Sequence, residues 1–456
     1  MTKLDLLRFP LIKTLLRSRW PQFLVRLLAL AGFVLAVLAG LLGTPVGSRS
    51  FAIVFVWILW WALLMLAAVP LFGRGWCSVC PIPMPGEWAQ QGALLGPLQA
   101  LTARWSLGRP WPRRLRGIWM QNAAFVLVAL FSARVLTTPL VSALVLGAFL
   151  LVALVTSLIF ERRAFCRYLC PVGGFIGLYS QLAPLELRVR DTAVCASHRE
   201  KTCYNGSLEG PYAGYGCPWG AFPGGLVRNT SCGLCMECLR TCPHDNIALN
   251  LRLPGADLEQ RRGRGLDEAY KGLIMLGSAL AYSAVMLGPW GALKAAAFAV
   301  GSLPWLGYAL GFLTLVLGVL PGLFLLAAAA GQRLAGRPLD RRSLKQAFAQ
   351  NAVALVPLGL AAWAAFSLAF AASSLTYIPV ALSDPFGWGW DLFGGAGVGW
   401  TPLMSGAVPP LQVIVLAGGI LWAARSAVDV QGGRAALPVI GFCLLAGAGL
   451  LWLLVG

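Results

Sequence analysis

The stretch FAIVFVWILWWALLMLAAVPLFGRGWCSVCP, residues 51–81, decides the fold class of this chain. Its first part, residues 51–72, contains no charged residue and is long enough to cross the hydrocarbon core of a bilayer as a helix, which needs about 20 residues. Arg74, Cys77 and Cys80 follow directly, and then a proline. The stretch therefore predicts a membrane-spanning helix with two thiols at one of its ends.

The composition indicates a membrane protein throughout. Of the 456 residues, 58% are hydrophobic and 12% are charged, about half the roughly 25% of globular domains. Apolar runs of spanning length recur, so we predict an all-α integral membrane protein with about nine transmembrane helices. The predicted spans are 23–43, 51–72, 118–137, 140–160, 270–290, 305–330, 348–372, 411–424 and 436–455. Residues 292–303 are compatible with a re-entrant element.

The net charge of +19 sets the predicted orientation of the chain. With the N-terminus in the cytoplasm, all but three of the 36 Lys and Arg residues fall on the inner side, the exceptions being Arg49, Arg134 and Lys294. This asymmetry follows the positive-inside rule, so the basic charge indicates topology and not nucleic-acid binding. We expect a multi-pass protein of a bacterial-type inner membrane, with residues 1–22 as an interfacial amphipathic helix and the C-terminus outside.

Eleven of the twelve cysteines lie in the predicted cytoplasmic part, where thiols stay reduced and metal binding is favoured over disulfides. The run CGLCMECLRTCP, residues 232–243, has the C-x2-C-x2-C-x3-C-P spacing of bacterial ferredoxins. A turning loop of this spacing offers three thiolates to one [4Fe–4S] cluster, and the fourth cysteine often turns to a neighbouring cluster. Structural zinc usually takes two separated ligand pairs, which makes it the weaker alternative. The predicted ligands are Cys232, Cys235, Cys238 and Cys242.

A second cluster is predicted beside the first, because a fourth cysteine that turns away needs partners upstream. Cys217 is followed by a proline, and Cys195 and Cys203 precede it. Each cluster takes four ligands, so two clusters need one ligand more than this segment has cysteines. His198, three residues after Cys195, is the candidate for the gap; an exposed loop histidine and a three-iron cluster are the alternatives. The predicted sets are Cys195, His198, Cys203 and Cys242 for one cluster, and Cys217, Cys232, Cys235 and Cys238 for the other.

Four further cysteines form a repeat. GRGWCSVCP ends the second predicted span and RRAFCRYLCP ends the fourth. Two helix pairs that each end in a cysteine pair and a proline indicate an internal duplication. If these pairs pack side by side, their thiols converge at the membrane surface and hold a third cluster, with redox-active dithiols or a zinc site as alternatives. The ligands would be Cys77, Cys80, Cys166 and Cys170. Cys443, inside the last span, is expected to be a packing residue.

The motifs GRGWCSVCP, FCRYLCPVG, GYGCPWG and CGLCMECLRTCP together resemble those of the membrane polyferredoxins of the NapH/NosR type, over roughly residues 23–251. The resemblance implies quinol-linked electron transfer through clusters on the cytoplasmic side, in support of a partner redox enzyme. The first motif of this chain has C-x2-C-P, where the family more often has C-x3-C-P. The C-terminal spans carry no motif that resembles a family.

A quinone site is expected at the inner ends of two membrane helices. The chain has two histidines and neither lies in a predicted span, so a bis-histidine haem b is excluded. Two similar amide pairs open the third and seventh predicted spans, and their side chains are suited to hydrogen-bond a quinone carbonyl. Hydrogen bonding between helices is the alternative for these amides. The residues are Gln121, Asn122, Gln350 and Asn351.

The predicted organisation has four parts. These are the interfacial helix at 1–22, two duplicated helix pairs at 23–182, a cytoplasmic ferredoxin-like iron–sulfur domain at 183–268 and a C-terminal transmembrane domain of about five helices at 269–456. The predicted function is a non-catalytic electron-transfer subunit of an oxidoreductase complex, between the quinone pool and another subunit or a soluble carrier, with quinol oxidation or quinone reduction at its membrane site. The alternatives are a factor that matures another metalloenzyme through its dithiols or clusters, and a transporter with redox-sensing clusters.

Overall fold

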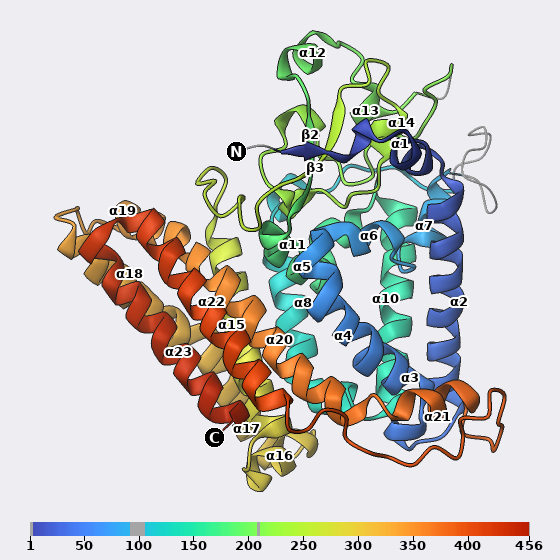
Figure 1. Ribbon diagram of the computed structural model, residues 1–456, viewed down its shortest axis with the longest axis vertical. Helices are drawn as coiled ribbons and strands as arrows, with labels where there is room; N and C mark the ends of the chain where they lie inside the picture. Colours follow the sequence, from blue (N-terminus) through green and yellow to red (C-terminus); the bar gives the residue numbers. More distant parts are fainter. Residues whose placement is uncertain (1–2, 92–104, 208–209, 456) are drawn as a thin grey trace. The chain divides into compact units, whose positions relative to one another are not determined.

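The computed structural model describes residues 3–91, 105–207 and 210–455, and most of them are helical (Figure 1). Within these ranges, eight helical stretches are long and apolar enough to cross a membrane. This confirms the all-α, multi-pass fold class. The stretches are Trp20–Leu42, Phe51–Val79, Pro139–Ile159, Leu266–Leu287, Leu303–Leu334, Arg341–Ser374, Val408–Gln431 and Gly433–Val455.

Several of these stretches consist of consecutive helices. The second span joins α3 to α6 through π-helical turns at Val54–Trp60 and Leu64–Ala68. The α-helices are α1 Pro10–Arg17, α2 Trp20–Leu42, α3 Phe51–Ile53, α4 Trp61–Leu63, α5 Val69–Phe72, α6 Trp76–Val79, α7 Met84–Gln91, α8 Trp119–Leu130, α9 Ser132–Val135, α10 Pro139–Ile159, α11 Pro171–Tyr179, α12 Thr192–Ser197, α13 Thr202–Asn205, α14 Glu237–Arg240, α15 Leu266–Tyr282, α16 Gly291–Phe298, α17 Leu303–Thr314, α18 Leu320–Leu334, α19 Arg341–Asn351, α20 Leu355–Ser374, α21 Tyr377–Ser383, α22 Val408–Gln431 and α23 Leu437–Val455. The strands are β1 Leu4–Asp5, β2 Leu185–Val189 and β3 Ile247–Leu251.

The predicted span at 118–137 is not one continuous helix. Helix α8 has 12 residues and ends before Phe131, whose backbone leaves the helical region, and the short α9 follows. At 1.5 Å per residue α8 is about 18 Å long, well short of the roughly 30 Å hydrocarbon core. Beyond the break, Arg134 Nε donates to the carbonyl of Phe298 at 2.7 Å. The apolar run was identified correctly, but its helix is interrupted where an arginine bonds to the last residue of α16.

The chain divides into two compact units that do not follow its linear order. One, the cysteine unit, comprises Met1–Val34, Ala68–Gln121 and Leu146–Gln260. The other, the helical unit, comprises Leu35–Ala67, Asn122–Val145 and Arg261–Gly456. Eleven cysteines belong to the cysteine unit, and the buried Cys443 belongs to the helical unit. The division cuts across the four consecutive parts expected from the sequence, because the N-terminus and both cysteine-bearing helix ends pack with the segment that follows them.

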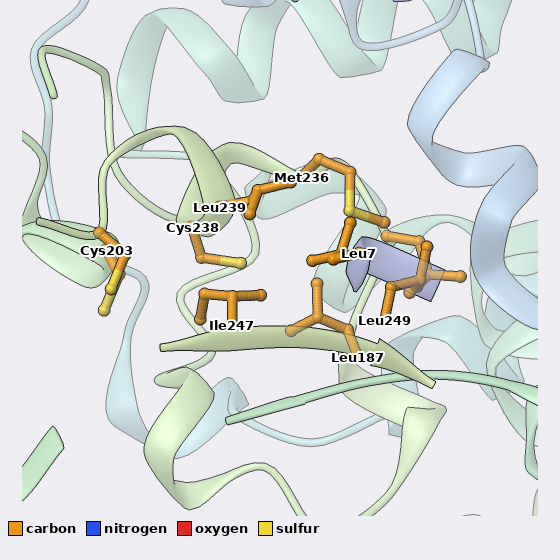
Figure 2. Packing of buried hydrophobic residues seen from close by; sticks show 10 residues of the cluster. Leu7, Leu187, Cys203, Met236, Cys238, Leu239, Ile247 and Leu249 are labelled. Atoms are coloured by element: carbon orange, nitrogen blue, oxygen red, sulfur yellow. The ribbon is translucent and has the colours of Figure 1, made fainter. Parts of the chain in front are cut away.

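A small antiparallel sheet in the order β1-β3-β2 supports the cysteine unit. Strand β2 alternates apolar and charged residues in sequence, and both Leu187 and the charged Glu186 are buried. Leu187 pairs with Leu249 across the two strands. Figure 2 shows these side chains and Ile247 facing Met236 and Leu239 from the cysteine loop. Apolar side chains of the sheet therefore pack against the segment that carries the motif cysteines.

The basic N-terminal segment packs on the cysteine unit. Leu7 is buried in the same apolar cluster, and β1 pairs with β3. Lys3 forms an ion pair with Glu186 at 2.7 Å and Lys13 with Asp245 at 2.6 Å. Leu11, on the amphipathic α1, remains 82% exposed. The charges of this segment thus have acidic partners within the unit, and α1 keeps an apolar residue on its outer face.

In the helical unit, α15, α18, α20, α22 and α23 pack against one another (Figure 1). Trp363 on α20 is buried and donates from Nε1 to the carbonyl of Met275 on α15 at 3.0 Å. A Cβ at Gly419 of α22 would overlap Ala361 of α20, so the absence of a side chain permits this close helix contact. Small residues of this kind are typical of helix packing inside membranes.

Candidate metal centres

The ferredoxin-like motif folds into a tight loop before α14. Leu234 and Met236 have φ angles of 49° and 61°, a left-handed conformation that is uncommon for residues other than glycine. A turn that contains residues of this kind points successive backbone N–H groups into a concave anion-binding nest, as at many iron–sulfur sites. Burial raises the pKa of the Cys232 thiol, and the hydrogen bond from the N–H of Leu234 opposes part of that rise. The strained backbone is therefore arranged for thiolate and sulfide acceptors.

Three motif cysteines and Cys217 form one group, which we call the motif site. Burial raises the pKa of Cys238 well above its ordinary value, and the thiols of Cys235, Cys232 and Cys217 raise it further. Burial raises the pKa of Cys232 to about 11 and that of Cys235 to about 12, with Cys217 contributing to both. Thiols that interact in this way lie close together. The motif site consists of Cys217, Cys232, Cys235 and Cys238, and the binding of one cluster by this set stays a prediction.

Cys195, Cys203 and Cys242 form a second group, the upstream site. Burial raises the pKa of Cys203 to about 12, and Cys242 and Cys195 are the next largest causes. Asn246 donates to both ends of the group, from Nδ2 to Cys195 Sγ at 3.3 Å and from its backbone N–H to Cys242 Sγ at 3.5 Å. Sequence patterns gave no indication of Asn246.

The predicted twelfth ligand, His198, lies next to the other histidine of the chain. Its ring centroid is 4.9 Å from that of His244, which follows Cys242 by two residues. His198 is partly exposed at the end of α12, the helix that carries Cys195. Both imidazoles are thus near the upstream site, and the role of His198 as a ligand stays a prediction.

The repeat cysteines form a third group, the paired-helix site: Cys77, Cys80, Cys166 and Cys170. Burial raises the pKa of Cys80 to about 12, and the thiols of Cys77 and Cys170 raise it further. Cys170 caps the N-terminus of α11, and its Sγ accepts from Gly173 N at 3.2 Å. Because Cys80 and Cys170 come from different halves of the repeat, the two helix ends do bring their thiols together.

A buried ion-pair network supports the paired-helix site. Arg163 donates from Nη1 to the carbonyl of Cys77 at 2.8 Å, and its Nε is paired with Glu87, which also pairs with Arg26. Burial alone would raise the pKa of Glu87, but Arg163 and Arg26 lower it to about 2. Gln121, predicted as a quinone residue, instead donates to the carbonyls of Cys166 and Arg167 at 3.0 and 2.9 Å.

The donor set of the three groups fits [4Fe–4S] clusters. Among the described residues no group of three or more His, Cys, Asp or Glu is arranged to hold one metal ion. A cubane cluster binds one thiolate at each of four irons and so holds its ligands farther apart than a single ion does. Arg74 Nε and Nη2 and Trp219 Nε1 are buried donors with no hydrogen-bond acceptor among the described residues. Cluster sulfurs are suitable acceptors for such donors.

The other predicted quinone residues belong to the helical unit. Asn122 donates to the carbonyl of Asp267 at 2.9 Å and Asn351 to that of Ala347 at 2.8 Å. The Oδ1 atoms of both asparagines are buried without a hydrogen-bond donor, whereas Gln350 is partly exposed. One turn after Asp267, the fully buried Lys271 places its Nζ 5.4 Å from the Phe125 ring. This buried cation was not predicted from the apolar segments of the sequence.

Comparisons with known proteins bear on the segments that carry the paired-helix site. A stretch of 109 residues is 32% identical to the "Putative electron transport protein YccM" of Escherichia coli (strain K12), and covers 23% of this chain and 27% of that protein. The chain thus matches about a quarter of the length of this relative. No solved structure matches the chain. Residues 53–117 and 142–190 match the family described as "4Fe-4S binding domain". The chain therefore contains a 4Fe-4S binding domain, whose two matched segments carry the four cysteines of the paired-helix site.

Proposed function

We propose that this chain is a membrane-bound electron-transfer subunit that passes electrons between a quinone pool and a partner redox protein through three [4Fe–4S] clusters. The observation that carries the proposal is the presence of the paired-helix, motif and upstream sites within one compact unit. Thiol sites that follow one another from the ends of apolar helices into a water-soluble fold suit an electron route that starts at the membrane surface. The 4Fe-4S binding domain supports this function.

Each cluster supplies reversible one-electron chemistry when bound. Residues of the chain hold it, exclude water from it and donate hydrogen bonds to it. Four cysteines would bind the cluster at the paired-helix site and four at the motif site. At the upstream site, Cys195, Cys203 and Cys242 would bind the third cluster, with His198 as the fourth ligand. The backbone of Gly173 and the amide of Asn246 donate to ligand sulfurs, which stabilises their thiolate form.

A quinone is the proposed membrane partner. The buried Oδ1 atoms of Asn122 and Asn351 need donors, and the hydroxyl groups of a quinol would provide them. Lys271 adds a buried ammonium group to the same unit, and buried cations in membrane helices commonly serve function. The charge asymmetry of the sequence supports a cytoplasmic N-terminus and cytoplasmic cysteine sites. The other partner would be a further subunit or a soluble electron carrier.

Iron content and EPR spectra of the purified chain in detergent test the proposal. Three clusters correspond to about twelve irons per chain. Cys235→Ser should remove the signal of one cluster, whereas the matched control Cys443→Ser should leave iron content and spectra unchanged. About four irons together with several reactive thiols would contradict the electron route and favour a maturation factor. For the quinone, reduction of the clusters by a short-chain quinol should be slowed by Asn122→Leu.

A further inference from the structure

Trp219 connects the segments that carry the motif site and the paired-helix site. It is 3% exposed and follows Cys217 by two residues. A Cβ at Gly233 would overlap the indole nitrogen, so the Trp219 ring edge lies directly against the loop between Cys232 and Cys235. This side of the indole therefore packs on the motif site.

The backbone of the Trp219 segment is bonded to the segment of Cys166. Arg163 N donates to the carbonyl of Pro218 at 3.0 Å, and Arg167 Nη1 donates to the carbonyl of Trp219 at 2.9 Å. Arg163 and Arg167 bracket Cys166 in sequence. The same short stretch thus contacts one site through its ring and the other through its backbone.

Two buried arginines lie over the Trp219 ring. The guanidinium carbon of Arg74 is 4.3 Å from the ring centroid and that of Arg163 is 5.8 Å away. The two residues are only 6% and 4% exposed. Each precedes the first cysteine of its repeat motif by three residues, so the internal duplication places one arginine from each half on the same indole. Such stacking of guanidinium groups on tryptophan is favourable when it is shielded from water.

Each arginine contacts segments of both thiol sites. Arg163 Nη1 donates to the carbonyl of Cys77 at 2.8 Å, and its backbone N–H donates to the carbonyl of Pro218, the residue after Cys217. Arg74 also donates to the carbonyl of Thr230, two residues before Cys232, while a Cβ at Gly177 of α11 would lie 3.0 Å from its Nη1. Its side chain therefore extends from the motif loop to the helix that Cys170 caps.

We propose that Trp219, Arg74 and Arg163 form the connection through which the paired-helix and motif sites exchange electrons, and that the two cations raise the reduction potentials of both clusters together. This inference rests on the proposed function. In the exchange one cluster loses one electron and the other gains it, and no bond is made or broken. A buried positive charge favours the reduced, more negative state of each cluster, and a charge shared by two sites shifts both potentials in the same direction.

EPR-monitored redox titration of the full chain in detergent tests the shared charge. Arg74→Gln should lower the midpoint potential of each of the two clusters by at least about 59 mV, which corresponds to a tenfold change in the equilibrium constant of a one-electron reduction. Arg74→Lys keeps the charge and should restore most of the shift. The control Arg190→Gln removes an arginine of the same unit that is paired with Asp5 and Asp245, and should change neither potential.

Trp219→Leu tests the connection itself. Electron equilibration between the two clusters, followed by rapid freeze-quench EPR after a reducing pulse, should slow at least tenfold with both clusters still present. A shift at one cluster alone in Arg74→Gln, or unchanged equilibration in Trp219→Leu, would overturn the inference. Iron content separates this failure from that of the proposed function, because loss of the proposed function would appear as a missing cluster in the unchanged chain.

A groove in the helical unit carries a second, independent inference. It has a volume of about 1080 Å³ and lies between α15, α18 and α19. Its walls are apolar, with Tyr270, Leu325 and Phe348 among them, and its rim carries Arg341 and Arg342, together with Lys345. No acidic residue lines it among the residues that the structure describes.

The rim cations have no acidic partner in the described ranges. Arg341, Arg342 and Lys345 form no ion pair there, and all three are exposed. The neighbouring Asp340 is occupied in capping α19, where it accepts from Ser343 Oγ at 2.6 Å. Apolar walls below a rim of unpaired cations complement an acyl chain below an anionic headgroup. We infer that this groove binds an anionic phospholipid.

Native mass spectrometry of the full chain with phosphatidylglycerol or phosphatidylcholine tests this site. Phosphatidylglycerol should bind at least tenfold more tightly, and R341Q/R342Q/K345Q should remove the preference. The control R425Q/R434Q, which changes exposed arginines outside the groove, should keep it. Equal binding of both lipids, competition by inorganic phosphate alone, or displacement of the lipid by a quinone would overturn the inference.

Discussion

Glu87→Gln removes the negative charge at the centre of the buried network behind the paired-helix site. Glu87 is 7% exposed and pairs with both Arg163 and Arg26. Arg163 is 4% exposed and cannot lose its proton, so the variant leaves a buried charge with one neutral partner. Breaking a buried pair in this way costs about 3–5 kcal/mol.

The lowered pKa of Glu87 gives a second estimate of the free energy that this buried ion pair contributes. Its fall from 4.5 to about 2 in the folded chain corresponds to about 3 kcal/mol, at about 1.4 kcal/mol per tenfold change in the proton equilibrium. Because the folded pKa is lowered, this stability is present above pH 4.5 and is lost as the pH falls from 4.5 towards 2. For a unit of roughly 200 residues, 3 kcal/mol lowers Tm by about 6–12 °C.

Thermal unfolding of the detergent-solubilised chain at pH 7, followed by tryptophan fluorescence, measures the effect. Glu161→Gln is the matched control, because Glu161 is exposed. We expect a lower Tm for Glu87→Gln, no change for the control, and a difference between wild type and Glu87→Gln that shrinks below pH 4.5. Equal Tm values for the two variants at pH 7, or a difference that is independent of pH down to 3, would refute the reasoning.

Two further predictions concern single contacts. Asn246→Ala removes the amide that donates to Cys195 Sγ at 3.3 Å, so an EPR titration should show a lower reduction potential at the upstream site alone. The control Asn250→Ala should leave this potential unchanged. An equal shift at all sites would contradict the assignment. Gly419→Ala inserts a methyl group where α20 and α22 touch and should lower the free energy of unfolding by about 1–3 kcal/mol. The control is Gly418→Ala, because a Cβ at Gly418 meets no atom within 4 Å. Equal losses for the two variants in a denaturant titration would show that the helices are farther apart.

The site residues that sequence reasoning missed act through contacts between distant segments. Trp219 is far in the chain from Arg74 and Glu87, and the sequence around each of the three has no distinctive pattern. The equal three-residue spacing from Arg74 to Cys77 and from Arg163 to Cys166 was the signal present in the sequence. It showed that the arginines are equivalent, but not that both lie over one indole.

The sequence by itself determined the features that depend on local chemistry. Length and apolarity of a run specify a spanning helix, because every backbone polar group must be bonded within the bilayer. The spacing of residues 232–243 predicts a cluster loop, because one short turn can deliver the thiols. The interruption at Phe131 escaped this reasoning, because Val135 and Leu136 continue the apolar run beyond Ser132 and Arg134.

Only the tertiary structure decided which distant groups meet. It brought Cys80 and Cys170 from the two halves of the repeat to one site and paired Lys13 with Asp245 across the chain. It also buried Lys271 beside an aromatic ring. The physical reason is that such contacts depend on how helices and loops pack, and many packings satisfy the same apolar pattern equally well. Thiol spacing within a loop is fixed by a few bonds, whereas thiol spacing between loops is fixed by the whole unit.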